Sequence, residues 1–133
     1  MKLSLIIPCY NEQDNVTPFF EETVKAFQQM PKAITSFEMI FVNDGSSDNT
    51  AKNLKELYKS YSSVVTVVDF SRNFGKEAAI SAGLASAAGD AVVVIDCDLQ
   101  HPPEKIIEMY RLWEQGYEIV EGIKRERGQE KKL

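Results

Sequence analysis

Short apolar runs rich in valine and isoleucine recur along the 133 residues, separated by longer segments with helical periodicity. Apolar and polar residues do not alternate within these runs, which is typical of strands buried on both faces of a sheet. Each run is too short to be a buried helix. We expect strands at residues 3–8, 39–42, 64–68, 91–95 and, from a weaker signal, 117–120.

The segments between these strands have the apolar spacing of amphipathic or buried helices. Their ends carry the usual signals, namely serine or proline at the start and glycine beyond the last turn. We expect helices from Val16 to Phe27, from Ala51 to Tyr61 after the capping candidates Ser46 and Ser47, from Lys76 to Ala88 before Gly89, and from Pro102 to Gly116.

This alternating order predicts an α/β fold with a Rossmann-like, mostly parallel sheet. Helices should cover both faces, and the connections between strands should be right-handed. The length suits one domain with one core. We expect residues 1–121 to form this unit, followed by a basic segment at 122–133.

Composition and charge exclude several classes of function. The net charge of −5 argues against nucleic acid as a partner, because binding to phosphates needs a clustered positive surface. The apolar run at the start is too short for a signal peptide or a membrane span. Cys9 and Cys97 form no disulfide framework, so we expect reduced thiols and a cytoplasmic location.

Polar clusters follow four of the predicted strands, where parallel sheets bind their ligands. Because these strand ends meet at one edge, their side chains should converge. No Gly-x-Gly-x-x-Gly or Walker-type loop follows the first strand, which argues against a dinucleotide or P-loop site. The clusters occupy residues 8–12, 43–48, 71–76 and 96–101.

Asp96 and Asp98 are the candidate metal ligands. Residues two apart in an extended chain point the same way, so both carboxylates should face one ligand. Paired carboxylates suit Mg²⁺ or Mn²⁺ with positions left for a diphosphate. The alternatives are ordinary turn chemistry, or a zinc site of Cys9, Cys97 and His101, which lacks zinc-like spacing.

The other strand ends offer groups for a nucleotide. Asp44 can accept a hydrogen bond from the imide N–H of uracil, whereas Asp48 is better explained as a dipole partner in a first helical turn. Arg72 and Lys76 flank Gly75 where a helix begins, which favours a diphosphate or a sugar hydroxyl. Solvated surface cations are the alternative, above all for Lys76.

Four segments of the chain resemble family 2 glycosyltransferases, which share the GT-A fold. The third and fourth are most similar to bacterial polyprenyl-phosphate glycosyltransferases and dolichyl-phosphate mannose synthases. Asn43 departs from the aspartate that many relatives carry, and Asp44 is intact. The segments are SLIIPCYNE at 4–12, FVNDGSSDNT at 41–50, SRNFGKEAAISAGLASAAGD at 71–90 and VVVIDCDLQHPPE at 92–104.

The resemblance implies roles for individual residues. Pro8, Tyr10 and Glu12 would border the base and ribose, and Asp44 would contact the base. Arg72 and Lys76 would lie near the donor, Asp96 would approach the ribose and metal, and Asp98 would hold the metal. No residue here is assigned as the general base, which is expected beyond Leu133.

The resemblance further implies an inverting, metal-dependent enzyme that moves a sugar from a nucleotide donor, a UDP-sugar, to a polyprenyl phosphate. The full-length enzyme is expected at the cytoplasmic face of the membrane. The alternatives are a saccharide acceptor or a nucleotide-binding fragment without catalysis. We also expect these 133 residues alone to be inactive and to self-associate through residues 117–123.

Overall fold

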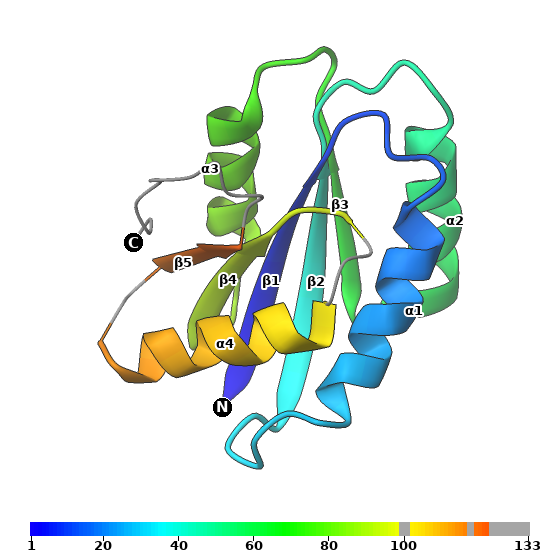
Figure 1. Cartoon of the computed structure of the whole chain (residues 1–133). Coiled ribbons are helices and arrows are strands. Elements are labelled where there is room, and N and C mark those ends of the chain that lie inside the picture. The colour runs from blue at the N-terminus through cyan, green and yellow to red at the C-terminus, as the bar shows by residue number, and fades with distance from the viewer. Residues whose placement is uncertain (99–101, 117–118, 123–133) are drawn as a thin grey trace.

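A computed structural model of the protein describes residues 1–98, 102–116 and 119–122 (Figure 1). Strands and helices alternate over these residues, as the apolar pattern predicts. Their bounds are β1 Lys2–Cys9, α1 Val16–Phe27, β2 Ser36–Asn43, α2 Thr50–Tyr61, β3 Val65–Asp69, α3 Lys76–Ser86, β4 Ala91–Ile95, α4 Pro102–Glu114 and β5 Ile119–Gly122.

The strands form one sheet in the order β3-β2-β1-β4-β5, and every neighbouring pair is parallel. The predicted α/β class and parallel sheet are therefore confirmed. Strand β1 pairs with β2 along its whole length, up to Cys9 beside Asn43. The carboxyl ends of β2, β1 and β4 are consequently neighbours at the middle of one edge of the sheet.

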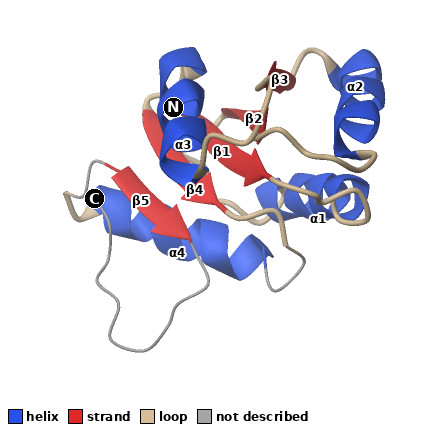
Figure 2. Cartoon of the chain, turned by 90° about the horizontal axis from the view of Figure 1, so that it is seen from above, coloured by secondary structure: helices blue, strands red, loops and turns tan. Residues whose placement is uncertain are grey.

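Helices cover both faces of the sheet, with α3 on one face and α1 and α4 on the other (Figure 2). Side chains of β1 alternate between the two cores. Leu3, Leu5 and Ile7 belong to the cluster under α1 and α4, whereas Ile6 belongs to the cluster under α3. Helix α3 lies very close to β1 at Gly83, where an added Cβ would be only 2.4 Å from Cγ2 of Ile6.

The connection from β4 through α4 to β5 has the opposite hand to the other three. Strands β2 and β5 lie on opposite sides of β1, yet α4 lies on the same face as α1. The expectation of right-handed crossovers throughout is wrong for this unit. Helix α4 takes that face because its Ile106 and Met109 are buried in the core cluster that α1 also covers.

Helix α2 begins at Thr50 with Asn49 as its N-cap residue, so the prediction that Ser46 and Ser47 cap it is wrong. Both serines instead bind the loop after β1. The Ser46 hydroxyl accepts a hydrogen bond from the Asn11 N–H at 2.9 Å, and the Ser47 N–H donates to the Asn11 side-chain oxygen at 2.8 Å. They therefore join the ends of β1 and β2.

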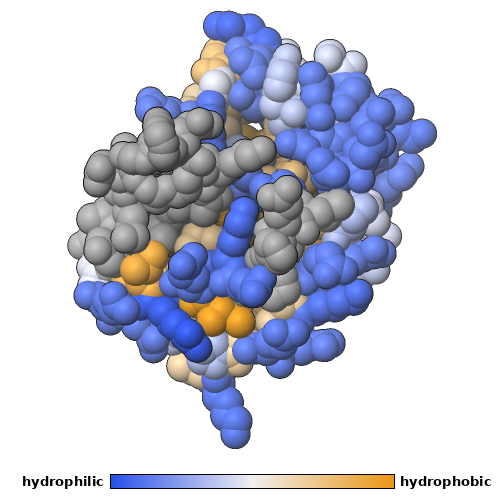
Figure 3. Space-filling view, viewed as in Figure 1, coloured by the Kyte–Doolittle hydropathy of each residue, from blue (hydrophilic) through white to orange (hydrophobic). Residues whose placement is uncertain are grey.

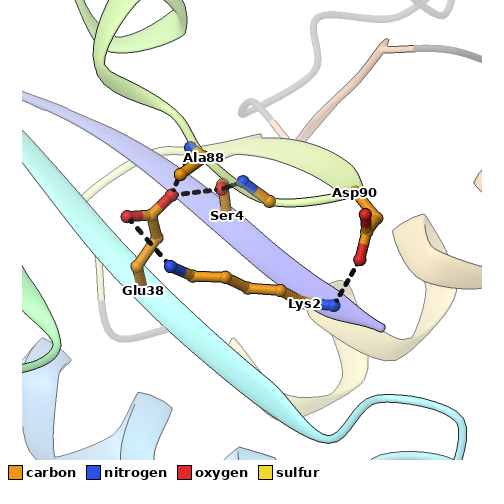
Figure 4. Close-up of polar contacts among 6 residues, drawn as sticks. Lys2, Ser4, Glu38, Ala88 and Asp90 are labelled. Atoms are coloured by element: carbon orange, nitrogen blue, oxygen red, sulfur yellow. Dashed lines mark hydrogen bonds and ion pairs between the residues drawn. The ribbon is translucent and has the colours of Figure 1, made fainter.

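A polar cluster ties the amino ends of three strands together (Figure 4). The Ser4 hydroxyl donates to Oε2 of Glu38 at 2.6 Å, and the Ala88 N–H donates to the same oxygen at 2.7 Å. The Gly89 N–H donates to the Ser4 hydroxyl at 2.8 Å, and Nζ of Lys2 lies 3.8 Å from Oε1 of Glu38. The loop between α3 and β4 is thus fixed to β1 and β2.

The face of the protein seen in Figure 3 is mostly hydrophilic over the described residues, with apolar residues gathered low in that view, where α4 lies. Within the described part of the chain, no helix has the length and apolar character needed to span a membrane. The side chains of residues 117–123, through which self-association was predicted, lie outside the described residues.

Candidate functional site

A hollow of about 160 Å³ lies at the carboxyl ends of β1, β2 and β4. Ligand pockets typically measure roughly 300–1,000 Å³, so this hollow fits only part of a nucleotide. Larger hollows, of about 650 Å³ beside α2 and β3 and about 540 Å³ along α4, contain none of the predicted site residues. The hollow at the strand ends is lined by Pro8, Cys9, Tyr10, Glu12, Asp44, Lys76 and Asp96.

The structure therefore brings together six of the eight residues predicted from the sequence. Arg72 and Asp98 do not line the hollow. The Arg72 side chain is exposed, and its guanidinium carbon lies 4.1 Å from the centre of the Phe74 ring. The roles of all eight residues toward a ligand stay predictions.

Asp44 is buried, with 5% of its surface exposed, and fixes the loop of residues 70–75, here called the Arg72 loop. Its carboxylate accepts hydrogen bonds from the Phe74 N–H at 2.7 Å, the Gly75 N–H at 3.0 Å and the Asn73 side-chain amide at 3.1 Å. A carboxylate has about four acceptor positions, so room remains for one further donor such as a base N–H. Asp44 thus already has a structural function.

The Arg72 loop passes directly over Gly45, the residue that follows Asp44. Gly45 has φ +69°, and a Cβ built on it would lie 2.1 Å from the carbonyl carbon of Arg72 and 2.2 Å from the Asn73 nitrogen. Only a residue without a side chain permits this approach. The motif at 43–48 therefore determines where the Arg72 loop lies.

The backbone from Asp96 to Asp98 is not extended, although an extended backbone was the basis for expecting both carboxylates to face one ligand. Strand β4 ends at Ile95, and the Asp98 N–H donates to the Asp96 carbonyl oxygen at 2.9 Å, which is a tight turn. The extended-chain expectation is therefore wrong for this pair. Nζ of Lys76 lies 2.7 Å from Oδ1 of Asp96, and Nζ of Lys105 lies 3.8 Å from Oδ2 of Asp98.

Among the described residues, no three acidic, histidine or cysteine side chains are grouped closely enough to hold a metal ion. The chain itself therefore offers two carboxylates, Asp96 and Asp98. Mg²⁺ is commonly held by one or two carboxylates together with substrate phosphates and water. The two aspartates fit a metal that binds together with a diphosphate, rather than a metal enclosed by the protein alone.

Glu12 lies in the same electrostatic environment. Partial burial raises the pKa of its carboxyl, and the negative charges of Asp96, Asp98 and Asp48 act in the same direction. A hydrogen bond of 2.8 Å from the Asn15 side-chain amide opposes the rise. Acidic side chains held together against their mutual repulsion are typical of a site that binds a cation or a cationic group.

We predict that Glu12→Gln raises the denaturant midpoint at pH 7, measured in EDTA. The folded protein holds the Glu12 proton more tightly than the unfolded chain, so the charged form lowers the free energy of unfolding above its pKa. This penalty disappears as the pH falls below the usual range of a glutamate, where both states are protonated. Equal midpoints for Glu12→Gln and wild type at pH 7 would contradict the prediction.

The loops around the hollow are joined by a polar network that the sequence did not reveal. Oδ1 of Asp48 accepts from the Thr50 N–H at 2.9 Å and from the Thr50 hydroxyl at 2.6 Å. Desolvation would raise the pKa of Asp48, but these hydrogen bonds outweigh it and lower the pKa. Thr50 also accepts from the Glu12 N–H at 2.8 Å, and the Asn53 side chain donates to the Gln13 carbonyl at 2.9 Å. Asp48 thus precedes the helix instead of lying in its first turn.

Cys9 and Cys97 are both buried and free. A hydrogen bond with the Cys97 thiol, and then burial, raise the pKa of the Cys9 thiol well above its usual range. Buried thiols of this kind are inert. His101, the third residue of the zinc alternative, lies outside the described residues.

A doubly covered parallel sheet with acidic and basic groups gathered at the carboxyl ends of its central strands defines a Rossmann-like α/β class of protein. Residues 4–133 match the family model described as glycosyl transferase family 2. The chain belongs to this family.

Curated relatives support the same assignment. Over 96% of its own length, the chain is 46% identical to an uncharacterized glycosyltransferase of Synechocystis. It is 40% identical to an undecaprenyl-phosphate 4-deoxy-4-formamido-L-arabinose transferase of Proteus mirabilis over 95%, and 42% identical to a bactoprenol glucosyl transferase of Shigella phage SfV over 90%. It spans only 38–39% of the length of these relatives.

Solved structures confirm the GT-A fold. A Pyrobaculum calidifontis mannosyltransferase in complex with GDP-Man and Mn²⁺ matches 82% of the chain and 31% of that protein, with a TM-score of 0.60 and 24% identity. Residues 1–349 of Staphylococcus aureus TarS in complex with UDP match 83% of the chain and 33% of that protein, with a TM-score of 0.57 and 28% identity.

Proposed function

We propose that this chain is the nucleotide-sugar-binding part of an inverting glycosyltransferase that moves a sugar from a UDP-sugar to a polyprenyl phosphate. The observation that carries this proposal is the meeting of Glu12, Asp44, Lys76 and Asp96 in one hollow at the strand ends. In this proposal residues 1–121 bind the donor, and residues 122–133 lead toward an acceptor-binding part.

The donor side follows from the chemistry of the hollow. The exposed ring of Tyr10 and the flat face of Pro8 suit a base, and the remaining acceptor position of Asp44 suits an imide N–H. Lys76 begins α3 at the edge of the hollow, where its ammonium group and the helix N-terminus favour a phosphate. TarS, whose structure contains UDP, supports uridine as the base.

Mg²⁺ or Mn²⁺ is the proposed cofactor, held by Asp98 and Asp96 together with the donor. Such an ion stabilises the negative charge that develops on a leaving diphosphate. Lys76 is paired with Oδ1 of Asp96 at 2.7 Å, so a bound cation would compete with this lysine for the same carboxylate. Its ammonium group is then available to the diphosphate.

The acceptor is inferred from the names of the relatives. An undecaprenyl-phosphate sugar transferase and a bactoprenol glucosyl transferase are among them, which favours a lipid phosphate over a saccharide. Because the chain spans 38–39% of these relatives, we propose that the general base and the acceptor site lie beyond Leu133. The complete enzyme would then act at the cytoplasmic face of the membrane.

We predict that UDP binds weakly without a divalent cation and at least tenfold more tightly with Mn²⁺ or Mg²⁺. The reason is that the ion relieves repulsion between the diphosphate and the carboxylates near Asp96. Isothermal titration calorimetry with UDP, in EDTA and in each metal, measures the difference. Asp98→Ala should abolish the metal effect.

A matched control is Asp14→Ala, which removes an exposed carboxylate in the loop after β1 that lies outside the hollow. This variant should keep the metal effect. Equal UDP affinity in EDTA and in metal would remove the role assigned to Asp98. Failure of the wild-type chain to bind UDP under any condition would remove the proposed donor.

A further inference from the structure

Phe74 is one of the few large apolar side chains exposed on the described surface, with 49% of its area accessible. A single exposed aromatic residue is ordinary in itself. The contacts of this ring are more informative. Its centre lies 4.1 Å from the guanidinium carbon of Arg72 and 5.6 Å from the centre of the Phe70 ring, which it meets edge to face.

The Phe74 ring packs against the Phe70 ring, which is itself fixed to the protein core. Phe70 packs against the core cluster between the sheet and α3, and its N–H donates to the Asn43 carbonyl oxygen at 2.9 Å. The backbone of Phe74 is fixed in turn, because its N–H donates to the buried carboxylate of Asp44 at 2.7 Å. The ring therefore offers a platform of defined position within the loop that Asp44 fixes.

Arg72 needs such a platform because a long exposed side chain otherwise samples many rotamers. Its guanidinium group lies over the Phe74 ring, a contact that uses the flat face of a cation. The N–H donors of guanidinium lie in its plane, so this contact leaves them available for two parallel bonds to a phosphate. A ring beneath the cation thus orients it without occupying its donors.

We propose that Phe74 is a positioning residue, whose ring holds the guanidinium group of Arg72 ready to bind a phosphate of a substrate. The inference rests on the proposed function, which places a phosphate-bearing ligand at this edge of the sheet. The phosphate is that of the nucleoside diphosphate, because the acceptor site is proposed to lie beyond Leu133.

The test is a double-mutant cycle with Arg72→Met, Phe74→Leu and the two combined. Calorimetry measures the binding of UDP with Mn²⁺ and of uridine, which has the same base and ribose but no phosphate. Phe74→Tyr keeps an aromatic ring at the position. Tyr58→Leu is the matched control, because Tyr58 is exposed to 47% and lies on α2, outside the hollow.

Arg72→Met should weaken UDP binding about tenfold or more and leave uridine unchanged. Phe74→Leu should weaken UDP binding roughly two- to fivefold, the range expected from an exposed cation–π contact. Phe74→Tyr should bind like wild type. The double variant should bind no more weakly than Arg72→Met, because the ring acts only through the arginine. Wild-type UDP affinity in Arg72→Met would contradict the inference.

Unchanged binding by Phe74→Leu beside a clear loss in Arg72→Met would overturn the inference. So would a Phe74→Leu effect that persists in full when Arg72 is already methionine, since the ring would then act independently of the cation. A wild-type chain that binds no UDP points instead to failure of the proposed function. Denaturation curves of each variant show whether the fold is intact, and Phe74→Tyr reports on the ring even if Phe74→Leu is unstable.

Discussion

Gly45→Ala is expected to lower the free energy of unfolding by about 3 kcal/mol and to abolish measurable UDP binding. A methyl group at Gly45 would meet the backbone of Arg72 and Asn73 at 2.1–2.2 Å, and backbone atoms cannot move away as a flexible side chain can. Overpacking costs roughly 1–3 kcal/mol, and an alanine at positive φ adds roughly 1–2 kcal/mol. Urea denaturation measures the loss of stability, and calorimetry with UDP measures the loss of binding.

Gly75→Ala shows the effect of backbone strain on stability without a steric clash. Gly75 has φ +105°, yet nothing lies within 4 Å of a Cβ built there. Gly75 combines φ +105° with ψ 163°, a region that essentially only glycine adopts, so this variant should be destabilised by backbone strain alone, roughly 1–3 kcal/mol. A loss below about 1 kcal/mol for Gly45→Ala would show that the close approach of the Arg72 loop does not constrain this position.

Asp44→Ala is expected to lower the free energy of unfolding by about 3 kcal/mol or more, with the change measured by urea denaturation. The substitution removes the acceptor for the N–H groups of Phe74 and Gly75 and for the Asn73 amide. Each buried donor left without a partner costs roughly 1–3 kcal/mol, although those near the surface recover part of this through water. The same variant should lose UDP binding with Mn²⁺, because the Arg72 loop is no longer held.

Asp69→Ala is the control for Asp44→Ala. Asp69 also ends a strand, but it is exposed and accepts a single hydrogen bond, from the Asn43 side chain at 3.0 Å. Its removal should cost no more than about 1 kcal/mol. Losses of similar size in the two variants would show that the burial and triple bonding of Asp44 do not stabilise the Arg72 loop.

The fold could be predicted from the sequence because its signals are local. Apolar runs of four to six residues, separated by segments with helical periodicity, are typical of a doubly covered parallel sheet. Ends of helices were less certain. Helix α3 ends at Ser86, whereas the sequence predicted that the helix would continue to Gly89. Gly89 instead lies where the chain passes so close to Ser4 that a side chain would not fit. A Cβ at Gly89 would lie 2.8 Å from the Ser4 nitrogen.

The sequence was sufficient to predict which residues gather at the site, but not how their side chains and loops are arranged. Parallel strands bring their carboxyl ends together whatever their sequence, so the residues that follow them must meet. The turn between Asp96 and Asp98 depends on hydrogen bonds within three residues, which no periodicity reports. The contact of Phe74 with Arg72 likewise depends on how the whole loop is fixed by Asp44.

The hand of the last crossover could not be read from the sequence either. The general preference for right-handed connections is strong, and nothing in the pattern of residues 102–122 contradicts it. The position of α4 is decided by burial of Ile106 and Met109 beside α1, on a face that the alternating pattern leaves unspecified. The face of the sheet on which a helix lies is thus determined by tertiary packing.

The cluster of Ser4, Glu38 and Gly89 lies toward the amino ends of the strands, at the edge of the sheet opposite the hollow. The strands are therefore held in register at this edge by positions that do not line the hollow. Tyr10 lines the hollow and is exposed, so a substitution there changes the hollow while the opposite edge stays intact. In the proposed function, such exposed lining positions would be able to vary under selection with little risk to the inherited scaffold, whereas Asp44 and Gly45 would not.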